Sequence, residues 1–225
     1  MAAISAQMVK ALRDRTGAGM MDCKNALTES DGDEEKAVEI IQKKGLAKVA
    51  KRAGAIATEG VVHAYIHAGS RVGVLVEVNC QTDFVARSPE FLEFVNSVGL
   101  QIAAMTPLFV RRSEVTADAI EKQRGIFLGQ MEQEEAQSGK KRPAEVRDKI
   151  VAGKLDKWQA EIALEEQSAV TSDEGKTIGQ LAEALSAKIG EKISVRRFVR
   201  YELGEGIEKK QSDFAAEIAE TLKGS

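Results

Sequence analysis

An acid and a large aromatic residue, Asp83 and Phe84, stand side by side where the chain is expected to turn. They follow an apolar, strand-like run (residues 72–78) and precede a helix-like segment that opens at Ser88-Pro89. Residues on a turn between two rigid elements are well placed to contact a partner. An exposed phenylalanine beside a carboxylate is costly to keep unless a partner uses it. For an isolated Asp-Phe pair, however, a helix cap and a core phenylalanine are the better interpretation.

The histidines and cysteines are the other candidates for site chemistry. His63 and His67 would face the same side of a strand, but no third ligand accompanies them at metal-binding spacing. A surface or contact role is therefore favoured over a metal site. Cys23 and Cys80 lie far apart, form no CxxC pair and have no orienting group at a recognisable spacing. This pattern favours reduced thiols over a disulfide and over nucleophilic catalysis.

Four further clusters have a structural and a functional interpretation. The glycines of Gly17-Ala18-Gly19 and Gly204-Glu205-Gly206 lack the Lys-Ser/Thr that follows in a phosphate loop, so turns are favoured. For Met20-Met21, core filling and an adaptable contact surface are equally supported. The basic residues within 43–52 are expected to form a solvated linker rather than a nucleic-acid site.

Composition limits the function classes. The 225 residues carry a net charge of −3 and only 4% aromatic residues, which argues against binding a nucleic acid directly. No apolar run reaches the roughly 20 residues that a membrane span needs, and residues 1–9 lack the pattern of a secretory signal. We therefore expect a cytoplasmic protein. Since no catalytic constellation is visible, we expect a binding or regulatory protein without a cofactor rather than an enzyme.

The periodicity predicts an α+β fold in five parts. The core is expected to hold a β-hairpin (residues 60–67 and 71–79), a helix opening at Ser88-Pro89, a helix over 177–189 and a third strand over 193–203 with a bulge near Arg196-Arg197. Together these strands would form a small three-stranded antiparallel sheet with packed helices. The parts are an N-terminal three-helix module (1–45, ending at Gly45), a basic linker (46–57) that can be partly helical, the α+β core (58–112 and 167–205), a projecting antiparallel helical hairpin (113–166) and a C-terminal helical module (206–225).

Several stretches resemble the elongation factor Ts family. They are LRDRTGAGMMDCK (residues 12–24), EVNCQTDFVA (77–86), GEGIEK (204–209) and DFAAE (213–217), and the resemblance spans the chain. It implies a guanine nucleotide exchange factor for the GTPase elongation factor Tu. It also implies that Arg13, Met20 and Met21 contact the partner's nucleotide domain. The alternative is a non-catalytic protein- or nucleic-acid-binding module built on the N-terminal helices.

The resemblance further implies that the turn Thr82-Asp83-Phe84-Val85 enters the region near the partner's bound Mg²⁺. Long members of the family carry two hairpin-helix units, whereas this chain has one, within residues 55–112, and so resembles the short form. A lone three-stranded sheet exposes an edge and a face, which invites pairing with a second copy. We therefore expect a homodimer, in which His67 contacts the partner from the other subunit.

Overall fold

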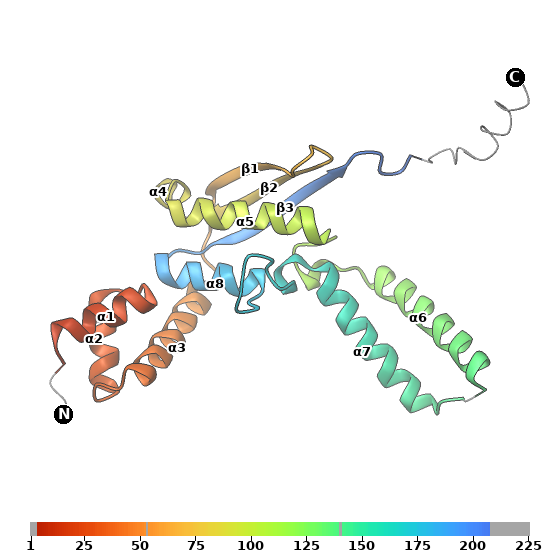
Figure 1. The fold of residues 1–225 in the computed structure, drawn as a ribbon, viewed down its shortest axis with the longest axis horizontal. Coiled ribbons are helices and arrows are strands. Elements are labelled where there is room, and N and C mark those ends of the chain that lie inside the picture. The colour runs from red at the N-terminus through yellow and green to blue at the C-terminus, as the bar shows by residue number, and fades with distance from the viewer. Residues whose placement is uncertain (1–3, 53, 140, 208–225) are drawn as a thin grey trace, which may run out of the picture.

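The computed structural model describes residues 4–52, 54–139 and 141–207 of the chain. It contains a three-stranded antiparallel sheet with helices packed against one face, so the α+β prediction is confirmed (Figure 1). The elements in chain order are α1 (Ala6–Thr16), α2 (Met20–Glu29), α3 (Glu34–Arg52), β1 (Glu59–Ile66), β2 (Val72–Cys80), α4 (Asp83–Ala86), α5 (Pro89–Met105), η1 (Arg112–Glu114), α6 (Ala117–Ser138), α7 (Ala144–Ile162), η2 (Leu164–Glu166), α8 (Ile178–Ile189) and β3 (Ser194–Glu202).

Helices α1, α2 and α3 form a small module with a core of its own. The hydroxyl of Ser5 accepts a hydrogen bond from the amide of Met8 at 3.2 Å and caps α1. A core of this size is marginal alone, and α3 also packs against α8 of the central part. The buried apolar residues of the module are Val9, Leu12, Cys23, Ala26, Leu27 and Ala37.

The predicted end of the third helix at Gly45 is wrong, because α3 continues to Arg52. A glycine inside a helix costs only about 1 kcal/mol, which tertiary packing can offset. At Gly45 the packing partner is α8, since a Cβ placed on this glycine would lie 3.3 Å from the Cβ of Ala187. Gly45 is therefore a close-approach position between two helices, and the first half of the linker 46–57 is helical.

The sheet has the order β1-β2-β3, and the predicted bulge is confirmed. Glu77 of β2 pairs with Arg197 while the next residue, Val78, pairs with Val195, so Arg196 is the extra residue of β3. Arg196 and Arg197 donate hydrogen bonds to the Glu77 carboxylate at 2.8 and 2.7 Å. These bonds lower the pKa of Glu77 to about 2, so the carboxylate stays ionised and paired at neutral pH.

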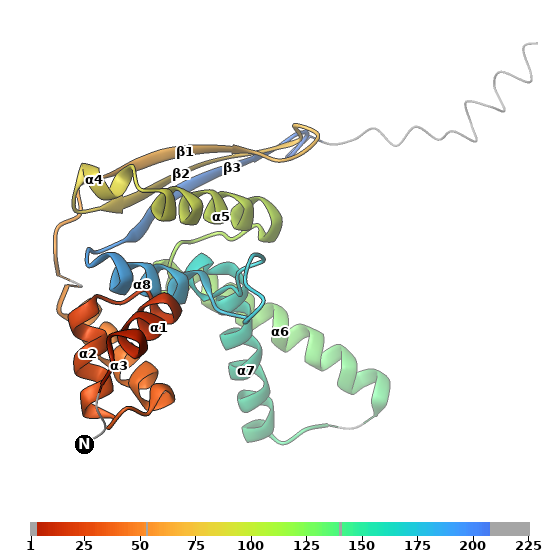
Figure 2. The ribbon, with the colours of Figure 1, turned by 60° about the vertical axis from the view of Figure 1, so that its left-hand side comes forward.

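The main core lies between the sheet and helices α5 and α8. Figures 1 and 2 show α5 lying directly against the sheet, with α8 on the far side of α5. The predicted start of α5 is confirmed, since Ser88 caps it and Pro89 is its first residue. A Cβ on Gly99 would lie 2.8 Å from the Cβ of Tyr65, so this glycine allows α5 to approach β1 closely. Fully buried members of this core include Val76, Val78, Phe91, Val95, Val98, Ile102, Leu164 and Ile178.

The opposite face of the sheet is open and largely apolar, apart from the ion pair of Glu77 and Arg197, which the register places beside Val62. No element of the described chain covers it in Figure 2. The register places one residue of each strand side by side across this face, as with Ala64, Leu75 and Val199. The exposed large apolar residues of the face, which we call the open sheet face, are Val62, Ile66, Leu75, Val199 and Tyr201.

Helices α6 and α7 form the predicted antiparallel hairpin, which projects from the core (Figures 1 and 2). Its buried seam is short and consists of Met131, Val151 and Leu155. Near the tip, the buried carboxylate of Glu135 pairs with Arg147 at 2.6 Å.

The helix predicted for the C-terminal module (206–225) lies outside the described residues, of which 207 is the last. None of the described helices combines the length and apolar character that crossing a membrane requires.

Candidate functional site

The turn between β2 and α5 is the single helical turn α4, and hydrogen bonds hold its start. The hydroxyl of Thr82 accepts a hydrogen bond from the amide of Val85 at 3.4 Å, which makes Thr82 the N-cap. The buried thiol of Cys80 donates to the carbonyl oxygen of Thr82 at 3.2 Å. Burial, and then the negative charge of Glu191, raises the pKa of the Cys80 thiol to about 11. The protonated thiol therefore holds the turn and is a poor nucleophile.

The side chains of the turn divide between solvent and core. Phe84 is 86% exposed, whereas Val85 is 9% exposed and belongs to the main core. Asp83 is exposed and forms an ion pair with Arg87 at 3.0 Å. The interpretation of Phe84 as a core residue is therefore wrong, because Val85 and Ala86 occupy the core positions of α4. An exposed aromatic on a short, anchored helix can insert into a partner surface.

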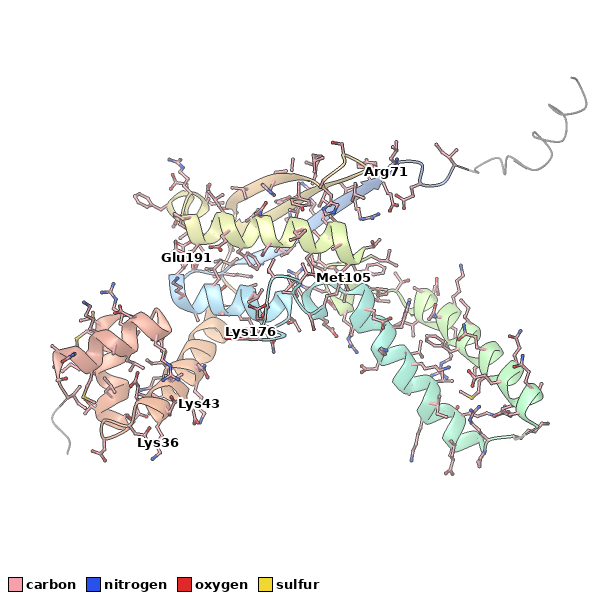
Figure 3. The ribbon with its side chains drawn as sticks, in the orientation of Figure 1. Lys36, Lys43, Arg71, Met105, Lys176 and Glu191 are labelled. Atoms are coloured by element: carbon pink, nitrogen blue, oxygen red, sulfur yellow. The ribbon has the colours of Figure 1, made fainter. Side chains whose placement is uncertain are left out.

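A carboxylate that the sequence did not single out anchors this turn. Glu191, in the connection between α8 and β3, accepts hydrogen bonds from the amides of Gln81 and Thr82 and from the hydroxyl of Thr82. Figure 3 labels Glu191 at the end of α8, next to α4. No local pattern indicates a contact between residues 109 positions apart. The single local signal is that Glu191 follows Gly190, the left-handed residue that ends α8.

The three N-terminal candidate residues lie near the end of α1 and at the start of α2. Arg13 is exposed near the end of α1, and Met20 and Met21, which begin α2, are 46% and 66% exposed. Exposure at both positions decides against core filling for this methionine pair. In Figures 1 and 2, α8 lies between this module and α4, so the structure does not bring these residues beside Phe84.

His67 lies at the far end of the sheet from the turn. It follows β1 in the hairpin loop, close to Arg71, which Figure 3 labels at the end away from α4. An eight-residue strand spans about 26 Å, so one subunit does not present His67 and Phe84 at the same spot. The Nδ1 atom of His67 lies 3.2 Å from the hydroxyl of Tyr65. Among the described residues, no three His, Cys, Asp or Glu side chains are placed to share a metal ion.

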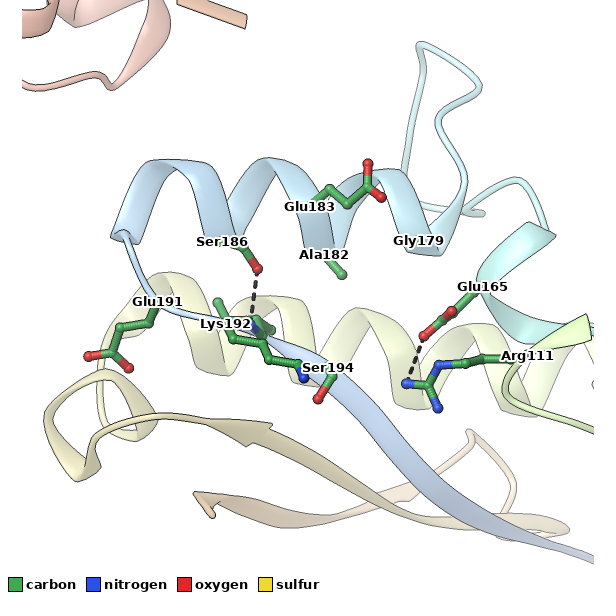
Figure 4. Close-up of a pocket in the computed structure, with 10 residues that line it drawn as sticks. Arg111, Glu165, Gly179, Ala182, Glu183, Ser186, Glu191, Lys192 and Ser194 are labelled. Carbon is green, nitrogen blue, oxygen red and sulfur yellow. Dashed lines mark hydrogen bonds and ion pairs between the residues drawn. The ribbon is translucent and has the colours of Figure 1, made fainter. Parts of the chain in front are cut away.

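A hollow of about 500 Å³ lies between α8 and the start of β3 (Figure 4). Its lining includes Arg111 and Glu165, which form an ion pair at 3.2 Å. Arg111 also donates to the backbone carbonyl of Val195 at 2.8 Å. Burial raises the pKa of Glu165, and the facing arginine opposes that shift. Arg111 and Glu165 are thus paired with each other rather than directed at a ligand.

The fold and this site define a modular α+β protein whose candidate functional residues lie on an exposed turn and an exposed helix junction rather than in a cavity. A family model described as elongation factor TS matches residues 3–205 of the chain. The chain belongs to the elongation factor Ts family.

Individual relatives agree over almost the whole length. The elongation factor Ts of Desulforamulus reducens is 55% identical over 223 residues, covering 99% of this chain and 100% of the relative. That of Carboxydothermus hydrogenoformans is 54% identical over 220 residues, covering 98% of both chains. That of Myxococcus xanthus is 53% identical over 222 residues, covering 99% of both chains. The resemblance inferred from the sequence is thus confirmed.

Proposed function

We propose that this protein is the guanine nucleotide exchange factor of elongation factor Tu in translation elongation. It would promote GDP release by disturbing the Mg²⁺ and phosphate site of that GTPase. The observation that carries the proposal is an 86% exposed Phe84 on an anchored turn, in a chain of the elongation factor Ts family. The protein acts in the cytoplasm, uses no cofactor of its own and makes or breaks no covalent bond.

The turn Thr82-Asp83-Phe84-Val85 is the part that acts on the nucleotide site. GDP is held by Mg²⁺, by backbone amides around its phosphates and by contacts to the base. Insertion of Phe84 between elements of the GTPase shifts the groups that hold the metal. Loss of Mg²⁺ weakens phosphate binding strongly, because the ion neutralises phosphate charge. Asp83, exposed beside Phe84, competes for polar or basic groups that support the site.

The N-terminal module supplies binding energy away from the nucleotide. Arg13, Met20 and Met21 are exposed, and methionine side chains adapt to an opposing surface. The module and the turn are then two separate contacts of one protein with one GTPase. Binding energy from the first contact can be used to drive the unfavourable insertion at the second.

The open sheet face is the proposed homodimer interface. Monomeric proteins rarely expose contiguous apolar patches of this kind, and two copies can bury Val62, Ile66, Leu75, Val199 and Tyr201 against each other. A dimer in which the two sheets pack with their strands antiparallel places the hairpin loop of one subunit near the turn of the other, so His67 can contact the GTPase that the second subunit binds. A dimer would thus present two copies of the turn.

The proposal predicts that nucleotide and exchange factor weaken each other's binding. A protein that binds the nucleotide-free GTPase best must, by linkage, be displaced when nucleotide returns. We expect a stable complex with nucleotide-free elongation factor Tu that dissociates on addition of GDP with Mg²⁺, and less completely with GDP and a chelator. Gel filtration of the complex with each addition measures this. A complex whose stability is unchanged by GDP and Mg²⁺ would rule out the exchange function.

A further inference from the structure

We propose that Glu191 is the positioning residue that fixes the direction of Phe84 and couples this turn to the N-terminal module. The inference rests on the proposed function, because it assigns how the active turn is held ready before the GTPase binds. Glu191 is distant in sequence from the turn and lies outside the four stretches that resemble the family, which are residues 12–24, 77–86, 204–209 and 213–217.

The carboxylate of Glu191 joins the end of α8 to the start of the turn through several hydrogen bonds. One oxygen of Glu191 accepts hydrogen bonds from the amide of Gln81 at 3.1 Å and from the amide of Thr82 at 3.0 Å. The other oxygen accepts a hydrogen bond from the hydroxyl of Thr82 at 2.7 Å. In return, the amide of Lys192 donates to the side-chain oxygen of Gln81 at 3.0 Å. Hydrogen bonds to an ionised acceptor are roughly twice as strong as neutral ones, so the two segments are firmly joined.

Thr82 connects the Glu191 carboxylate to the backbone that carries Phe84. The hydroxyl of Thr82 donates to Glu191 and accepts from the amide of Val85, so one group links the carboxylate to the first turn of α4. Phe84 itself is too exposed for packing to set its direction. The backbone of α4 must therefore set it, and that backbone is held by Glu191 at one end and by the buried Val85 at the other. A side chain held in its bound direction loses less entropy on binding.

The last turn of α8, just before Glu191, contacts the N-terminal module. Helix α8 ends at Ile189, two residues before Glu191. On its last turn, Ala187 meets Gly45 of α3 at close approach, and the nearest side-chain carbon of Lys188, Cε, would lie 3.2 Å from a Cβ on Gly17. Gly17 lies between the helices that carry Arg13 and Met20. One short segment, residues 187–191, thus contacts the N-terminal module at its start and the turn at its end. Figure 4 labels Glu191 just beyond the end of α8.

The test is a double-variant comparison with the full chain, using stimulated release of fluorescent GDP from elongation factor Tu. We expect Glu191→Ala to lower the stimulated rate about tenfold, the effect of losing a charged hydrogen bond. In a chain that already carries Phe84→Ala, the same change should lower the rate by less than about twofold, since Glu191 acts through Phe84. Fully additive losses would overturn the proposal. Glu183→Gln, an exposed carboxylate on α8, is the charge control, and an equal loss there would also overturn it.

A second readout does not depend on exchange activity. Amide hydrogen exchange at Gln81 and Thr82 should accelerate at least about tenfold in Glu191→Ala, while amides in the centre of α5 keep their wild-type protection. Unchanged exchange at both amides would contradict the role of Glu191 even if the protein proved not to act on the GTPase. If Glu191→Ala fails to fold, Glu191→Gln replaces it in both experiments, and we expect the stimulated rate of GDP release to fall about threefold. A wild-type chain that fails to stimulate release refutes the proposed function alone.

Discussion

Replacing Phe84 by alanine should lower the stimulated rate of GDP release by roughly 30-fold, because truncating an aromatic anchor at a contact costs about 2 kcal/mol. Phe84 is 86% exposed, so the free energy of unfolding should change by no more than about 0.5 kcal/mol. Stopped-flow release of fluorescent GDP from elongation factor Tu gives the rate, and thermal unfolding gives the stability. Phe84→Leu should retain part of the rate, because leucine keeps some of the inserted volume.

The matched control is Leu108→Ala, which removes an exposed apolar side chain at the base of the helical hairpin, away from the turn. We expect its exchange rate to equal that of the unmodified chain. If Phe84→Ala also releases GDP at the unmodified rate, insertion of an aromatic side chain is not the mechanism. If both variants lose activity equally, the loss reflects general surface change and not a specific site.

A charge on the open sheet face should separate the two subunits of the proposed dimer. Leu75 lies on the central strand, with Ala64 and Val199 beside it. Leu75→Asp would place a carboxylate without a partner in an apolar interface, which costs several kcal/mol. We expect the dimer dissociation constant to rise at least about 100-fold, measured by sedimentation equilibrium.

Leu92→Asp provides the comparison, because Leu92 is about as exposed as Leu75 (45% against 47%) but lies on α5. This variant should sediment as the unmodified chain does. An unmodified chain that sediments as a monomer at working concentration would contradict the homodimer. A Leu75→Asp chain that remains dimeric would contradict the proposed interface, since the two copies would then not meet through the open sheet face.

The features predicted from the sequence are those fixed by nearby residues. The start of α5 follows from Ser88 and Pro89, which act within one turn of the helix. The bulge at Arg196 follows from a break in alternation along one strand. The sequence also predicts the turn at residues 82–85, but it does not predict that Phe84 faces solvent while Val85 faces the core. Which side of a four-residue helix faces the core depends on packing against distant elements.

The features that the sequence did not reveal depend on contacts between distant segments. Gly45 resembles a helix end in its local sequence. In the structure, however, its lack of a side chain allows α3 to pack closely against Ala187 of α8. Glu191 resembles any surface acid after a helix, yet it holds Gln81 and Thr82. Local propensity contains no information on either contact, because each arises only when α8 folds back against the rest of the chain.

The central claim is that this protein accelerates nucleotide exchange, and release of fluorescent GDP from elongation factor Tu measures that most directly. With excess unlabelled nucleotide present, we predict that the release rate rises with the concentration of this protein and then saturates. Amounts of this protein below one per GTPase should release the fluorescent GDP from all GTPase molecules, because the incoming nucleotide displaces the exchange factor, which then acts again. Release that stays at the spontaneous rate, at concentrations where the two proteins form a complex, would contradict the account.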